Sequence, residues 1–295
     1  MEKQFKIFLA TDYSEAVMSA ERYAIQFTES TNAFLTIAHV YEVPFNFPSE
    51  PAQYAIATEK LRKSELLRLK QHFNKLVHSL NVKLNNLNFE CIVLEGTIGK
   101  QIWKEAEQSH MDIIITGTHG ASGFRKMLLG SHTWDIIKKS EVPVLAIPRD
   151  AVLTKIKNIV FATEYRKGEI PGIHFLAQLA KKFDAELTIL HITNDSLSKE
   201  FEKIVFEKFR ADLQKNVSYD KLSLRLVHYT DIVEGLNNFC LSSKTDWLVL
   251  SHAKPFFLES IFTRVNSITK EMCFQTHIPL LTLPDFYAVV SENLI

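Results

Sequence analysis

Short apolar runs alternate along the chain with longer segments in which apolar residues recur every three or four positions. The strand-like runs of the first half lie near 5–11, 33–40, 87–94, 112–116 and 143–147. The helix-like segments lie near 14–30, 55–81, 98–109 and 131–140. The strand runs are almost continuously apolar, which is typical of a parallel sheet covered by helices on both faces. The pattern therefore predicts an α/β fold.

The chain is an internal repeat. Three blocks of the first half recur in the same order in the second, the first two 152 positions later and the third 136 positions later. Duplication of one domain explains such a pattern, and it predicts domains at 1–150 and 151–295. The matched blocks are 8–13 with 160–165, 35–40 with 187–192, and 142–148 with 278–284.

The first half contains an insertion. Asp112 matches Asp246 at an offset of 134, so about 18 extra residues lie between Val40 and Asp112. The segment Pro44 to Thr58 is rich in Pro, Phe, Asn and Ser, and we expect the insertion there. Because it follows the end of a predicted strand, we hypothesise that it is a lid over the ligand site described below.

Glycine is concentrated in one part of the first half, since six of the nine glycines lie within residues 96–130. Gly117 and Gly120 follow a predicted strand, and Gly130 and Ser131 precede the next predicted helix. Such a loop suits an anion, because glycines let the backbone approach a phosphate and the first N–H groups of a helix are unpaired. A turn would explain any single glycine, but the hydroxyl of Ser131 adds a phosphate ligand. We therefore predict a phosphate site.

Two standard nucleotide motifs are excluded by their spacing. The segment from Gly96 to Lys100 looks like the end of a Walker A loop. That motif requires glycine where this chain has Leu94 and Ser or Thr where it has Gln101. The glycines after the predicted strand are spaced in threes, which also excludes the dinucleotide fingerprint.

Charge and cysteine content exclude further classes. The chain has 34 basic and 34 acidic residues, so no overall field attracts nucleic acid or an anionic membrane. No apolar stretch approaches the roughly 18–20 residues that a membrane span needs, and the charged N-terminus does not resemble a secretory leader. The three cysteines are far apart, which argues against a disulfide framework or a zinc site. We therefore expect a cytoplasmic protein without a metal centre of its own.

The glycine pattern, together with Ala10-Thr11-Asp12 after the first predicted strand, closely resembles the universal stress protein family across both halves of the chain. The resemblance implies two tandem five-stranded parallel-sheet domains of the adenine-nucleotide-binding, Rossmann-like type. It also implies a site for ATP, ADP or AMP, which Mg²⁺ often accompanies. By resemblance, the binding residues are Asp12 and Val40 for the nucleoside, and Thr116, Gly117, Gly120, Gly130, Ser131 and His132 for ribose and phosphates.

Other roles remain open for two kinds of residue. Asp12 can accept bonds from ribose hydroxyls or the adenine amino group, or it can cap the helix that begins nearby. Ser14 is also placed to cap that helix. His39 and His191 recur at the same repeat position at strand ends, so we expect both to be structural.

The second half departs from the family pattern at the nucleotide loop. A Cβ in the phosphate cradle blocks close approach of the ligand. We therefore predict one nucleotide per chain, in the first domain, with a degenerate second domain. The replacements are Ser251 for Gly117, Lys254 for Gly120, Asn266-Ser267 for Gly130-Ser131, and Glu164 for Asp12.

The leading functional hypothesis is an ATP-binding stress-response or signalling module that is read by an unidentified protein partner. A slow ATPase or autophosphorylating enzyme is one alternative, although no general base is evident beside the phosphates. A nucleotide-free interaction scaffold is another. In the family, the last strands pair across a dimer, so we expect the two domains to form a pseudo-dimer within the chain. A further homodimer remains open.

Overall fold

The computed structural model describes residues 4–118, 131–153, 155–194, 199–252 and 278–284. The chain divides into two compact units, Met1–Leu153 and Thr154–Ile295. Each unit is built around five strands, and each is described by itself below.

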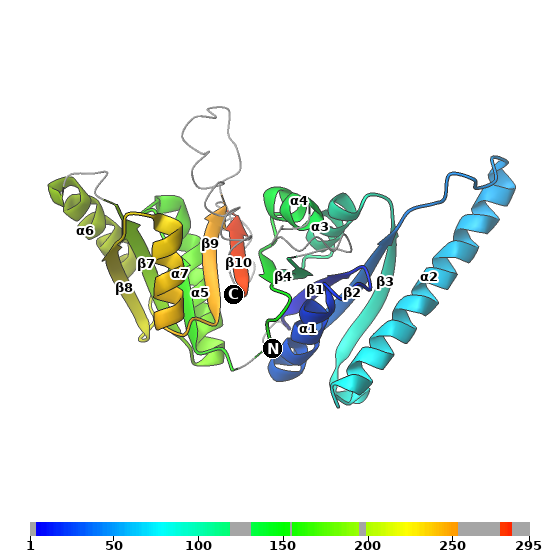
Figure 1. The fold of residues 1–295 in the computed structure, drawn as a ribbon, viewed down its shortest axis with the longest axis horizontal. Helices are drawn as coiled ribbons and strands as arrows, with labels where there is room; N and C mark the ends of the chain where they lie inside the picture. The colour runs from blue at the N-terminus through cyan, green and yellow to red at the C-terminus, as the bar shows by residue number, and fades with distance from the viewer. Residues whose placement is uncertain (1–3, 119–130, 154, 195–198, 253–277, 285–295) are drawn as a thin grey trace. The chain divides into compact units, whose positions relative to one another are not determined.

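The first unit is a five-stranded parallel sheet with helices between the strands (Figure 1). The strand order is β3-β2-β1-β4-β5, and every neighbouring pair is parallel. This confirms the predicted α/β fold, and each strand begins and ends within one residue of its expected bounds. The strands are β1 (Lys6–Thr11), β2 (Phe34–Tyr41), β3 (Asn88–Glu95), β4 (Ile113–Gly117) and β5 (Val144–Ile147). The helices are α1 (Met18–Thr31), α2 (Pro51–Ser79), α3 (Ile98–Gln108) and α4 (Ser131–Lys139), with a 3-10 turn η1 (Leu84–Asn86).

The topology creates a switch point between β1 and β4. From β1 the chain moves outward to β2 and β3, and it then returns to the other side of β1 as β4 and β5. Right-handed crossovers consequently place α1 and α2 on one face of the sheet and α3 and α4 on the other. Ligands of open α/β sheets bind beyond the carboxyl ends of the strands at such a point.

The two strands at the switch point form the centre of the core. Ile7, Phe8 and Leu9 of β1 and residues 113–115 of β4 are 0% exposed. Consecutive residues of a strand point to opposite faces, so full burial of three in a row requires helices on both sides. This explains why the strand runs of the sequence are continuously apolar rather than alternating.

The start of α1 differs from the expectation that Ser14 caps it. The helix begins at Met18, and Val17 is its N-cap without a side-chain bond. The backbone N–H of Ser14 instead donates to Asp12 Oδ1 at 3.0 Å. A short polar side chain that binds the backbone two residues later makes a turn that competes with helix formation. The cap prediction was therefore wrong because the Asp12 turn precedes the helix.

The insertion of the first unit is partly helical. We expected the insertion at 44–58 and the helix from about 55, but α2 begins at Pro51, where the missing N–H of proline costs no hydrogen bond. The helix has 29 residues, and the described part of its counterpart in the second unit, α6 (Lys199–Asn216), has 18. Residues 51–68 are all exposed or half-buried, and the first buried residue is Leu69. The insertion thus lengthens a helix as well as a loop.

The second unit repeats the topology of the first. Its strand order, β8-β7-β6-β9-β10, is again parallel throughout. The strands are β6 (Asn158–Ala162), β7 (Glu186–Thr193), β8 (Leu222–His228), β9 (Trp247–His252) and β10 (Leu280–Pro284). The remaining described elements are η2 (Lys167–Glu169), α5 (Ile170–Phe183) and α7 (Ile232–Ser242). The shared topology agrees with a tandem arrangement of one domain type.

Candidate functional site

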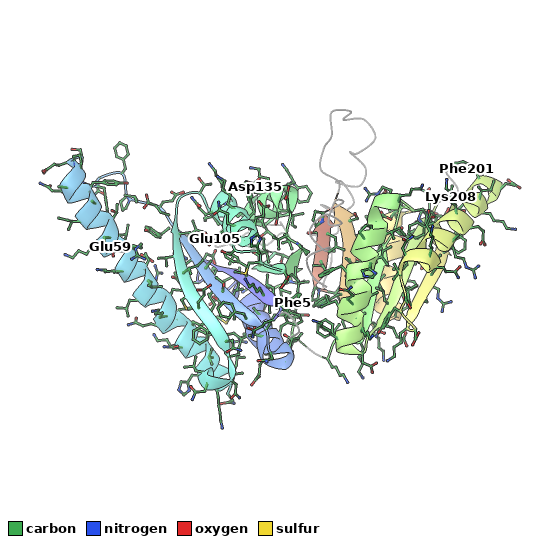
Figure 2. All side chains as sticks on the ribbon, turned by 180° about the vertical axis from the view of Figure 1, so that it is seen from behind. Phe5, Glu59, Glu105, Asp135, Phe201 and Lys208 are labelled. Carbon is green, nitrogen blue, oxygen red and sulfur yellow. The ribbon has the colours of Figure 1, made fainter. Side chains whose placement is uncertain are left out.

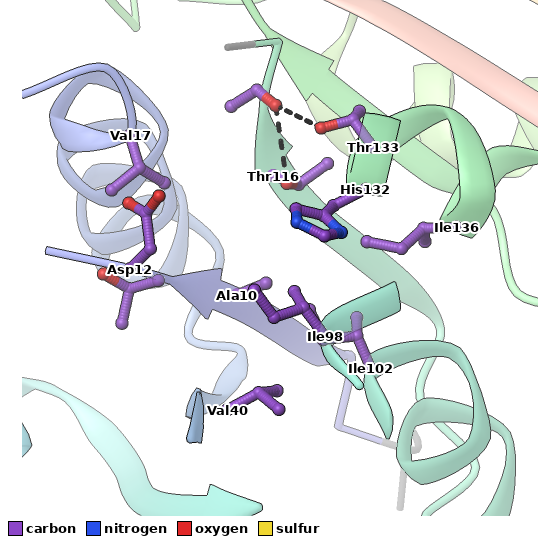
Figure 3. Close-up of a pocket in the computed structure, with 12 residues that line it drawn as sticks. Ala10, Asp12, Val17, Val40, Ile98, Ile102, Thr116, His132, Thr133 and Ile136 are labelled. Carbon is purple, nitrogen blue, oxygen red and sulfur yellow. Dashed lines mark hydrogen bonds between the residues drawn. The ribbon is translucent and has the colours of Figure 1, made fainter. Parts of the chain in front are cut away.

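A pocket lies in the first unit where β1, β2 and β4 end and α4 begins (Figure 3). Its empty space, which includes open solvent at the mouth, is about 550 Å³. Five of the eight residues expected to bind the nucleotide line it: Asp12, Val40, Thr116, Gly117 and His132. Three distant segments of the sequence therefore meet at one place.

The other three residues expected to bind the nucleotide lie wholly or partly outside the described residues. Gly120 and Gly130 lie outside the described residues. Ser131 begins α4, so its backbone lies at the helix N-terminus, but its side chain is outside the described part. Their proposed contacts with ribose and phosphates stay predictions.

Asp12 is an exposed carboxylate on the pocket wall, directly after β1 (Figure 3). Its Oδ1 accepts the N–H of Ser14 at 3.0 Å, which fixes the side chain on the backbone turn. It does not cap α1, whose N-cap is Val17. The alternative role as a helix cap is thus excluded, while the capacity to accept bonds from a ligand remains.

The end of β4 is tied to the first turn of α4. Thr133 is 5% exposed, and its hydroxyl donates to the carbonyl of Gly117 at 2.8 Å (Figure 3). The N–H of Thr118 donates to the carbonyl of Ile147 on the neighbouring strand. These bonds fix the backbone from which the glycine loop departs. Sequence reasoning missed Thr133, because its partner is 16 residues away.

The rest of the pocket wall is mostly apolar. Ile98 and Ile102 of α3 and Ile136 of α4 line it together with Val40 at the end of β2, and apolar lining of this kind suits a ring (Figure 3). The pocket therefore has an apolar part beside an exposed carboxylate and a helix N-terminus, which suits a ligand with a ring and an anionic tail. The lining residues that were not among those expected to bind the nucleotide are Ala10, Thr11, Val17, Ile98, Ile102, Thr133 and Ile136.

His39 does not line the pocket but supports its edge. Its Nδ1 lies 2.9 Å from the carbonyl oxygen of Thr11, and a carbonyl can only accept, so Nδ1 carries the proton. The ring of Tyr13 packs on His39 with centroids 4.3 Å apart. His191 holds the carbonyl of Thr163 in the same way at 2.7 Å. Both histidines thus hold the end of the first strand of their unit.

The corresponding acidic residue of the second unit has a cationic neighbour. Glu164 Oε2 lies 3.8 Å from Nε of Arg166, which also donates to Oε1 of the buried Glu169 at 3.1 Å. Ser251, at the position of Gly117, is buried at the end of β9. Lys254, Asn266 and Ser267 lie outside the described residues.

The remaining described residues contain no candidate for a metal site, a membrane-spanning helix or an activated thiol. No cluster of three His, Cys, Asp or Glu side chains in the described part is placed to hold a metal ion. The described helices include none long and apolar enough to cross a bilayer. Burial raises the pKa of the Cys91 and Cys240 thiols to about 11, so neither is an activated nucleophile.

Comparison with known proteins places these features in a family. Residues 5–148 match the model of the universal stress protein family. Two curated relatives come from Methanocaldococcus jannaschii. The universal stress protein MJ0577 is 29% identical over 153 residues, which is 49% of this chain and 94% of that protein. The universal stress protein MJ0531 is 30% identical over 146 residues, 49% of this chain and 82% of that protein.

A solved structure extends the similarity in fold to the second half. A universal stress protein from Archaeoglobus fulgidus covers 95% of this chain and 98% of its own, with a TM-score of 0.67 and 18% identity.

Proposed function

Because this chain belongs to the universal stress protein family, we propose that its first unit binds ATP, or another adenine nucleotide such as ADP or AMP, and serves as a cytoplasmic stress-response module. One observation carries the proposal. Asp12, Val40, Thr116, Gly117 and His132, which come from three strand ends and one helix start, line a single pocket at the switch point of the sheet.

Each part of the nucleotide has a matching part of the pocket. Asp12 accepts bonds from the ribose hydroxyls, and the backbone at Val40 meets the adenine beside the apolar wall. The phosphates lie at the N-terminus of α4, where Gly117 and the N–H groups of the first helical turn support them. Gly120, Gly130 and Ser131 complete the phosphate site in the proposal. Mg²⁺ would be bound chiefly by phosphate oxygens and water, as is common for this ion.

We propose one nucleotide per chain. In the second unit the acidic residue at the position of Asp12 is Glu164, which has the guanidinium of Arg166 as a neighbour. A carboxylate with a cation beside it is a poorer acceptor for ribose hydroxyls, because the two interactions compete. Ser251 also adds a Cβ where the first unit has Gly117.

The role of the nucleotide is regulatory in this proposal. Occupancy shifts the conformational equilibrium of the first unit, and an unidentified protein partner binds one state better than the other.

The test is to identify and count the nucleotide. The full chain is purified without added nucleotide and denatured, and the released molecules are identified by chromatography and mass. ATP–Mg²⁺ binding is then measured by calorimetry on the wild type, on Asp12→Asn and on the matched control Glu164→Gln. We expect about one nucleotide per chain, with an affinity about 10-fold lower in Asp12→Asn, since a hydrogen bond to a charged group contributes roughly 1.5–3 kcal/mol.

Glu164→Gln should leave the affinity unchanged. An empty wild-type protein that also fails to bind added ATP–Mg²⁺ would overturn the proposal, and a stoichiometry of two would overturn the assignment to the first unit.

A further inference from the structure

A cluster of aromatic and charged side chains surrounds Tyr13, the residue after Asp12. The Tyr13 ring packs on His39 at 4.3 Å and meets His72 edge-on at 5.1 Å. The guanidinium of Arg68 lies over the same ring, 4.5 Å from its centroid. Glu65 Oε2 lies 3.8 Å from His39 Nε2 and 3.7 Å from Arg68 Nη1. Three members of this Tyr13 cluster, Glu65, Arg68 and His72, belong to α2.

A buried carboxylate links the cluster to the end of β1. Glu21 is 2% exposed, and its Oε1 accepts from the Thr11 hydroxyl at 2.5 Å and lies 2.8 Å from His72 Nε2. The N–H of Tyr13 donates to the same Thr11 hydroxyl oxygen at 3.1 Å. The residues on both sides of Asp12 are therefore held, and His72 of α2 takes part in holding them.

This arrangement is costly to maintain. The backbone angle φ of Tyr13 is 63°, a left-handed conformation that residues with a side chain seldom adopt. The Tyr13 hydroxyl, Glu21 Oε2 and Glu65 Oε2 are buried and make no hydrogen bond to any protein group of the described residues. Strained backbone and unsatisfied buried polar atoms persist where the surrounding structure enforces them, and they cluster at ligand sites and switch regions.

The second unit supplies a comparison, because it keeps part of this arrangement and changes the rest. Tyr165 also has a left-handed backbone (φ of 60°) and a buried hydroxyl without a hydrogen bond in the described part, and it stacks on His191 at 4.1 Å. The Thr163 hydroxyl donates to the buried Glu169 at 2.6 Å. However, the helix partners of Tyr165 are Phe206 and Phe209 of α6, at 6.0 and 5.2 Å.

The threonine, tyrosine and histidine that both units share thus form the end of the first strand in each unit. A helix carboxylate also approaches the histidine in both units, Glu65 at 3.8 Å and Glu202 at 4.0 Å. The contacts made by Arg68 and His72, by contrast, occur in the unit that has the family's glycine loop.

The same helix carries the exposed surface of the insertion. Its first 18 residues, 51–68, include no buried residue, and this part of the helix extends past the end of β3 (Figure 1). Glu59 on this part points to solvent (Figure 2). Arg68 ends this segment and His72 lies one turn further, so the helix connects an exposed surface with the residues that hold Asp12.

We propose that Tyr13 is a positioning residue for Asp12, and that Arg68 and His72 couple occupancy of the nucleotide pocket to α2. The inference rests on the proposed nucleotide function and adds the route by which the bound state reaches the protein surface. A ligand on Asp12 stabilises the backbone from 11 to 13 and thereby the contacts of Tyr13 with α2. By linkage, a partner that stabilises α2 raises the affinity for the nucleotide by the same factor.

The test measures affinity and helix protection in the same variants of the full chain. His72→Phe introduces the residue type that packs on Tyr165 in the second unit, and Arg68→Met removes the charge while keeping most of the side-chain packing. ATP–Mg²⁺ affinity is measured by calorimetry, and hydrogen exchange is followed for amides 55–72 with and without saturating nucleotide. The first helical amides are omitted, because they have no intrahelical acceptor.

In the wild type, nucleotide should slow exchange in this segment. We expect affinity to fall about 5-fold or more in either variant, which is the lower end of typical coupling, and the nucleotide-dependent protection to disappear even at saturation. A purely structural role of His72 would lower stability but leave the protection intact. Tyr13→Ala and Tyr165→Ala form a matched pair, of which only the first should weaken binding.

Wild-type affinity and unchanged protection of 55–72 in both His72→Phe and Arg68→Met would overturn the inference. Failure of the wild type to bind ATP–Mg²⁺ would instead overturn the proposed function, so the two outcomes are distinguishable.

Discussion

Replacing Thr133 by Val tests whether the bond between α4 and the end of β4 holds the pocket in place. The Thr133 hydroxyl is buried and donates to the Gly117 carbonyl at 2.8 Å. Valine has nearly the same shape, so the substitution leaves no cavity and keeps the branched Cβ. The Thr116 hydroxyl is 3.5 Å from the same carbonyl, too far to replace the lost donor well.

The expected cost is that of a buried acceptor deprived of its donor, about 1–3 kcal/mol. Since each 1.4 kcal/mol is a factor of about ten, exchange of the β4 amides should become roughly 5- to 150-fold faster wherever it requires opening of the first unit. Nucleotide affinity should fall as well, because Gly117 lines the pocket.

Hydrogen exchange read by mass spectrometry is the appropriate assay, because peptides of β4 report on the first unit alone. Global unfolding of a two-unit chain need not be two-state. Thr133→Ser is the control, since it keeps the hydroxyl and removes one methyl group. The reasoning predicts that the Val variant is less protected than the Ser variant. The opposite order would show that apolar packing outweighs the hydrogen bond, and the argument would fail.

Two further outcomes follow from burial. Phe73 is 1% exposed and packs on Phe89 with ring centroids 4.7 Å apart, so Phe73→Ala should lower the free energy of unfolding of the first unit by about 3–5 kcal/mol. The control Phe201→Ala, at a residue that is 53% exposed, should change the free energy measured by urea unfolding by less than about 0.5 kcal/mol. Because burial raises the pKa of the Cys91 and Cys240 thiols to about 11, both should react with maleimide at pH 8 over 100-fold more slowly than an exposed cysteine, whose pKa is about 8.5. Labelling should speed up as pH rises towards 11, and rapid modification of either peptide at pH 8 would contradict the assigned burial.

The sequence predicted the strands well because their signal is local. A strand covered on both faces is apolar at every position, and residues 113–115 illustrate this with 0% exposure. The expected site residues Asp12, Val40 and Gly117 were identified for a related reason. They directly follow or end such strands, and parallel topology brings strand ends together.

What the sequence did not predict depends on contacts between distant segments. The hydroxyl of Thr133 matters because of the Gly117 carbonyl, and nothing near Thr133 in the sequence indicates that partner. The same holds for His72, whose partner Glu21 is 51 residues away. The start of α1 was misplaced because the side chain of Asp12 competes for the local backbone, and composition alone does not reveal which competitor prevails.

The comparison of the two units separates structural from functional roles within one chain. Thr11, Tyr13 and His39 have counterparts in Thr163, Tyr165 and His191 with the same bonds, so these groups are required to form the strand end. Among the described residues, the differences gather at the pocket and on one helix. Glutamate beside an arginine stands where the first unit has an exposed aspartate.

The helix partners of the tyrosine likewise differ, since Tyr165 meets two phenylalanines where Tyr13 meets Arg68 and His72. The contact of the histidine with a helix carboxylate is kept in both units. Loss of ligand contacts alone would leave the helix contacts unchanged. That the site and the helix contacts differ together is what coupling between them predicts. In the proposal the second unit binds no nucleotide, so its helix has no bound state to report.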